Sequence, residues 1–133
     1  MANFETISGK IIEAHLRFAD QWPDLYGNGW VEALIQLYAT GEWHYRDDNR
    51  HEGYSVVLFG PHGPRYRHPP ATVVEELRAM PGVSSVQITF HENRAPDQHA
   101  MPPGGFRLAI VNAFSLEAGC AARDKLRAAL LVL

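Results

Sequence analysis

The stretch TVVEELRAMPGVSSVQITF, residues 72–90, contains the change of pattern that decides the fold. Apolar residues recur every three or four positions in its first half, and Thr72 and Glu75 have the spacing of a capping box, which predicts a helix. The Pro81-Gly82 pair ends this helix. From Val86 onward apolar and polar residues alternate, as they do in a strand with one buried face. The stretch therefore predicts a helix that passes through a short turn into a strand.

Strand patterns also lie on both sides of this stretch. Residues 54–59 are β-branched or aromatic, and residues 106–115 carry apolar side chains at successive positions, which is typical of a strand covered on both faces. A helical pattern follows from Ser115. Residues 54–129 thus run strand, helix, strand, strand, helix, an order that resembles most of a ferredoxin-like split βαβ unit. This resemblance implies an architecture only, because that fold carries many unrelated functions.

The first third of the chain has a helical pattern. A second helix is expected between the glycines near residue 29 and Gly41, after which apolar residues alternate at Trp43 and Tyr45. We therefore expect one α+β domain over residues 1–133, with a four-stranded, mainly antiparallel sheet, helices on one face and an N-terminal helical pair in front. The apolar face of the first helix of this pair is expected to comprise Phe4, Ile7, Ile11, Ala14, Phe18 and Trp22.

Composition narrows the classes of partner. The 133 residues are 46% hydrophobic and carry a net charge of −3, which argues against nucleic-acid binding. No apolar run approaches the roughly 20 residues of a membrane span, and no secretory signal is visible at the N-terminus. The single cysteine, Cys120, suits a reducing compartment. We expect a cytoplasmic protein with neither a nucleic-acid nor a membrane partner.

His91 is the strongest candidate for catalysis. It follows the alternating strand and adjoins an irregular loop rich in proline and glycine, where an active-site lid is often found. No nucleophile motif, phosphate-binding loop or dinucleotide fingerprint is present, so no cofactor is expected. One alternative function is therefore a small cofactor-independent enzyme of the lyase, isomerase or cyclase type, with His91 as general acid or base.

Seven histidines make a metal site a second alternative. His44, His91 and His99 can converge if their segments are neighbours in the fold. The chain lacks the spacings of the established zinc and calcium motifs, so this prediction depends on the tertiary structure. It describes a divalent metal binder that uses imidazole ligands.

The leading prediction is a non-enzymatic protein that binds another protein. Arginine outnumbers lysine ten to two, and aromatic residues crowd the first half of the chain. Arginine and aromatic side chains are enriched where protein surfaces bind. The predicted role is an inhibitor, regulator or adaptor, or self-association as a homodimer. The predicted binding residues are Tyr26, Tyr66, Arg46, Arg65 and Arg67.

Overall fold

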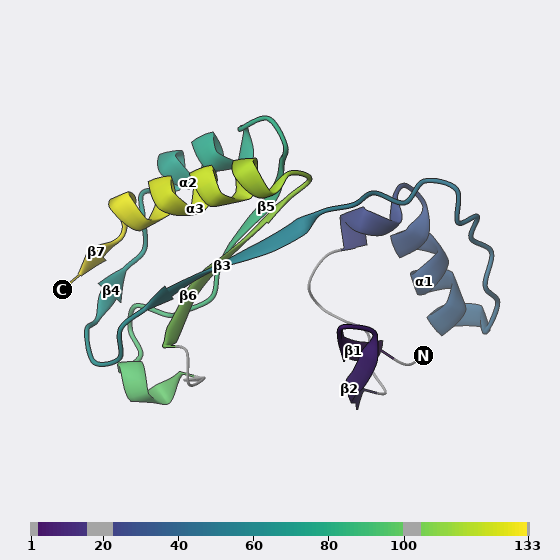
Figure 1. The fold of residues 1–133 in the computed structure, drawn as a ribbon, viewed down its shortest axis with the longest axis horizontal. Coiled ribbons are helices and arrows are strands. Elements are labelled where there is room, and N and C mark those ends of the chain that lie inside the picture. Colours follow the sequence, from purple (N-terminus) through teal and green to yellow (C-terminus); the bar gives the residue numbers. More distant parts are fainter. Residues whose placement is uncertain (1–2, 16–22, 100–104, 133) are drawn as a thin grey trace. The chain divides into compact units, whose positions relative to one another are not determined.

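The computed structural model describes residues 3–15, 23–99 and 105–132 (Figure 1). The chain divides into two compact units, residues 1–50 and residues 51–133. In the described part of the chain, no helix is both long enough and apolar enough to cross a membrane.

The second unit is built on a sheet of three strands in the order β3-β6-β5. Strands β3 (Tyr54–Gly60) and β5 (Val83–Ile88) each pair antiparallel with the central strand β6 (Phe106–Ala113). The two outer strands therefore run parallel to each other. Helix α2 (Ala71–Arg78) lies between β3 and β5 in the chain, and helix α3 (Leu116–Ala129) follows β6.

Both helices lie on the same face of this sheet (Figure 1). Gly119 of α3 sits against Val56 and Ala113, so these residues point toward the helices. The core between the layers is largely apolar and includes three aromatic rings, from β4, from β6 and from the segment after β5. Its buried members are Leu58, Tyr66, Leu77, Val86, Phe90, Phe106, Leu108, Ala109, Val111, Ala122 and Leu126.

The predicted four-stranded sheet is wrong. Residues 42–53 form no strand, although Trp43 and Tyr45 alternate with polar residues. These two rings contact each other, and the ring of Trp43 meets Trp30 edge to face at 6.3 Å. Ring contacts within an aromatic cluster thus account for the alternation that a pleated strand would also produce.

The C-terminal strand does not join β3, β6 and β5 as a fourth strand of their sheet. β7 (Leu131–Val132) pairs antiparallel with the equally short β4 (Tyr66–Arg67), and these two form a separate ladder. The outer edge of β3 therefore has no neighbouring strand within the described residues.

The predicted N-terminal helical pair is wrong as well. The first unit opens with a hairpin of β1 (Asn3–Ile7) and β2 (Lys10–His15), and the predicted helix positions Phe18 and Trp22 lie outside the described residues. Ser8 and Gly9 at the turn have φ of 49° and 77°. Two successive residues with positive φ make a tight hairpin turn and cannot continue a right-handed helix. The second predicted helix is present as α1 (Trp30–Thr40), after the 3₁₀ turn η1 (Pro23–Tyr26).

Candidate protein-binding site

In the part of the chain that the structure describes, the outer edge of β3 is an open edge of the sheet. Every second residue of an edge strand directs its N–H and C=O groups away from its one neighbour. Within the described residues, β3 has backbone hydrogen bonds to β6 alone. The outward groups of β3 are therefore available for pairing with another extended chain.

The side chains of β3 do nothing to block this edge. Its sequence YSVVLFG has no charged residue and no proline, the two features that most often prevent pairing at an edge. Tyr54 and Phe59, near its two ends, remain 45% and 42% exposed. The edge thus combines free backbone groups with exposed aromatic surface.

The opposite edge of the sheet is different because a side chain covers it. One guanidinium nitrogen of Arg78, at the end of α2, donates a hydrogen bond to the carbonyl oxygen of Val86 in β5 at 3.0 Å. This bond occupies an acceptor that an added strand would need and places a positive charge on the edge. The two edges of one sheet are therefore chemically unequal.

Packing and strand pairing within the second unit hold β3 in place. Val56 and Leu58 are buried, and Gly119 lets α3 approach Val56 closely. The register places Val57 of β3 and Gln87 of β5 on either side of Ile110 in β6. An edge fixed in this way loses little conformational entropy when a partner binds.

A polar row crosses the sheet on the face away from the helices. The hydroxyl of Ser55 donates to the side-chain oxygen of Asn112 at 2.6 Å, and the amide nitrogen of Asn112 donates to the hydroxyl of Ser85 at 2.9 Å. Asn112 is completely buried, at 0% exposure. Because the three residues share one ladder position, these bonds reinforce the strand register.

The structure brings His91 and His99 together, as the metal prediction requires. The backbone N–H of His91 donates to Nε2 of His99 at 2.9 Å, and Nδ1 of His99 donates to the carbonyl of Ala95 at 3.1 Å. Both ring nitrogens of His99 thus hold the loop in place, and a metal ion would have to displace one of these bonds. His44 belongs to the first unit, where its Nε2 lies 3.2 Å from Glu42.

As the catalytic candidate, His91 is exposed, and its ring stacks against that of His99 with centroids 6.1 Å apart. The neighbouring Glu92 carboxylate accepts the backbone N–H of His68. This carboxylate therefore helps to connect the segments after β4 and β5. Among the described residues, the contacts of His91 and Glu92 hold loops together, and no proton relay is formed.

The predicted binding tyrosines lie in two different environments. Tyr26 is half-buried and stacks on Trp30 with centroids 4.5 Å apart, while its carbonyl accepts a hydrogen bond from the Tyr45 hydroxyl. Tyr66 is only 6% exposed and contacts Phe90 and Phe106, and its burial raises the pKa of its hydroxyl. The ring of Tyr66 therefore contributes to the core and presents little surface to a partner.

The predicted binding arginines are all exposed. Arg65 and Arg67 lie on either side of Tyr66, and Arg46 lies in the first unit. None of the three forms an ion pair with another described residue. Each can therefore contact an acidic partner without first losing such a pair.

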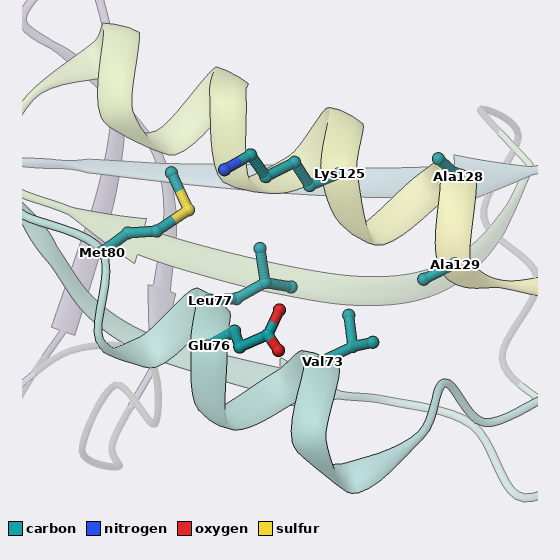
Figure 2. A pocket seen from close by; sticks show the side chains of 7 residues that line it. All are labelled: Val73, Glu76, Leu77, Met80, Lys125, Ala128 and Ala129. Atoms are coloured by element: carbon teal, nitrogen blue, oxygen red, sulfur yellow. The ribbon is translucent and has the colours of Figure 1, made fainter.

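Two further features are formed by residues other than those of β3. Helices α2 and α3 border a groove of about 430 Å³, shown in Figure 2, with Glu76 on one helix and Lys125 on the other. In the first unit, Nε2 of His15 lies 3.2 Å from Glu5 and 3.4 Å from Glu13, and the three side chains form a group across the hairpin. The contacts of the His15 ring with the two carboxylates already account for the placement of the three side chains.

Sequence reasoning predicted β3 as a strand but named none of its residues as a site. The available signal was the lack of charge and proline over residues 54–60. That signal becomes meaningful only when the strand is known to lie at an edge. Comparison with known proteins adds no assignment, since no family model, no curated protein and no solved structure matches the chain.

Proposed function

We propose that this protein works by binding another polypeptide chain through the outer edge of β3. Strand addition gives affinity through backbone hydrogen bonds and gives specificity through alternate side chains. The observation that carries the proposal is that no described strand pairs with this uncharged edge, while the other edge of the sheet is covered by Arg78.

The exposed aromatic rings supply the side-chain component of the contact. Tyr54 and Phe59 lie on opposite faces of β3, because their positions differ by an odd number of residues. An added strand would therefore contact one ring on each face. Aromatic side chains of this kind bury a large area upon binding.

The test uses the full-length chain as bait in extracts of the native host. Val57→Lys places a charge in the middle of the open edge, and Gln87→Lys places the same charge at the same ladder level on the covered edge. We expect the wild type and Gln87→Lys to retain the same partner and Val57→Lys to lose it. Circular dichroism of each variant checks that the fold is intact. Retention of identical proteins by all three baits would contradict the proposal.

A further inference from the structure

We infer that the chain bound at the β3 edge is a second copy of this protein, paired antiparallel about a two-fold axis at Val57. The inference rests on the proposed function and names its partner. Val57 is the middle residue of β3, so this axis pairs the strand with itself over its whole length. Such an interface is isologous, because the same surface is used by both copies.

This register is complementary in size. Val57 faces Val57 of the second copy, Val56 faces Leu58, Ser55 faces Phe59, and Tyr54 faces Gly60. Each exposed aromatic ring thus meets one of the smallest residues of the strand, at both ends of the pair. A bulky side chain at Gly60 is excluded for an internal reason, since a Cβ there would collide with the Tyr66 hydroxyl and with Leu108.

Charge does not oppose this pairing. No charged residue lies within β3, so pairing two copies brings no like charges together.

Other registers fit less well. A shift by one residue would turn the alternate side chains of one copy to the other face of the sheet. A shift of two residues toward the C-terminal end of the strand would carry Pro61 into the paired region, and proline has no N–H to donate. The bulge opposite Leu58 and Phe59 does not interrupt the edge, because its extra residue, Leu108, belongs to β6.

The resulting dimer has one continuous sheet of six strands, three from each copy. An axis perpendicular to the sheet keeps the helices of both copies on the same face. The two-fold pairing also leaves neither copy with an unpaired β3 edge.

The oligomeric state of the full-length chain tests this inference. Sedimentation equilibrium should give twice the chain mass of 14.9 kDa for the wild type and for Gln87→Lys, and the single-chain mass for Val57→Lys and Val57→Glu. Mixing the Lys and Glu variants should restore dimers, because opposite charges then face each other at the axis. A misfolded variant would not be rescued in this way.

Disulfide crosslinking tests the same inference if a charged variant fails to fold. The Val57→Cys variant, combined with Cys120→Ser, should form an intermolecular disulfide under mild oxidation, whereas Gln87→Cys with Cys120→Ser should not. The thiols of Val57→Cys are directly opposite each other in this register. Equal crosslinking of the two variants would overturn the inference.

The outcomes separate this inference from the proposed function. A wild type that stays monomeric, or a dimer that Val57→Lys leaves intact, overturns self-pairing. If the wild type is monomeric but Val57→Lys alone loses a partner from extracts, strand addition stands with a different partner. If the wild type is monomeric and every bait retains the same proteins, both the self-pairing inference and the proposed function are contradicted.

Discussion

Gly119 of α3 lies so close to Val56 of β3 that a Cβ built on the glycine would be 2.8 Å from Cγ2 of the valine. Gly119→Ala should therefore force the helix away from the sheet. Overpacking typically costs about 1–3 kcal/mol, and the better helix propensity of alanine returns about 1 kcal/mol. We expect a net loss of up to about 2 kcal/mol in the free energy of unfolding, measured by urea denaturation.

Shortening the opposing side chain is the control for this substitution. Val56→Ala leaves a small cavity, and adding Gly119→Ala fills part of it. The double variant should therefore be more stable than the sum of the two single effects predicts. A Gly119→Ala protein more stable than the wild type by about 1 kcal/mol, the full gain in helix propensity, would show that α3 and β3 are not held at this separation.

Ser115 caps helix α3, since its hydroxyl accepts the backbone N–H of Ala118 at 3.1 Å. Ser115→Ala should reduce the free energy of unfolding by about 1 kcal/mol, while Ser115→Asp should preserve the cap. Thr72→Ala is the matched comparison, because α2 begins at Ala71 and its N-cap Pro70 makes no side-chain bond. Thermal denaturation should show a lower melting temperature for Ser115→Ala only. A similar loss of melting temperature for Thr72→Ala would show instead that Thr72 caps α2, as the capping-box spacing in the sequence predicts.

Asn112 is the buried centre of the polar row in the sheet. Asn112→Ala removes its bonds to Ser55 and Ser85 and leaves a cavity in the central strand. The loss of such a buried polar side chain typically costs about 1–3 kcal/mol. Ser55→Ala should cost less, since Ser55 is exposed and its partner stays bonded to Ser85. Equal effects of the two substitutions in urea denaturation would argue against this ranking.

Tyr66 should make the protein sensitive to alkaline pH. Burial raises its pKa above the ordinary value of 10.0, so between the two values the folded chain binds a proton that the unfolded chain has lost. The free energy of unfolding therefore falls as the pH rises above about 10, and the contribution is fully present at lower pH. Tyr66→Phe should flatten this fall in denaturation curves recorded at a series of pH values. An unchanged pH dependence would assign the alkaline loss to other groups.

Arg78 should control assembly at the second edge of the sheet. Arg78→Ala frees the carbonyl of Val86 and removes the positive charge beside it. A dimer joined at β3 would then carry a free edge at each end, so we expect concentration-dependent species larger than a dimer in light scattering. Arg78→Lys keeps the charge and should behave like the wild type. Dimers alone from Arg78→Ala would show that Arg78 is not required to protect β5.

The N-terminal hairpin shows why local periodicity misled the prediction. Phe4, Ile7 and Ile11 have helical spacing, but the backbone turns back at Ser8 and Gly9. In the hairpin these apolar side chains are 55–64% exposed, so their spacing does not follow a buried face. A spacing of three or four residues indicates a helix only when one face is buried.

The sequence by itself determined five elements of the second unit: a β-branched and aromatic run marks β3, alternation marks β5, successive apolar residues mark β6, and helical spacing marks α2 and α3. Each of these patterns reflects burial within a local segment, which neighbouring residues record directly. Only the tertiary structure decided that β7 pairs with β4, that Arg78 covers one edge of the sheet, and that no described strand pairs with β3 at the other. Strand pairing depends on hydrogen bonds between backbone groups far apart in the chain, and every residue type except proline carries the same groups.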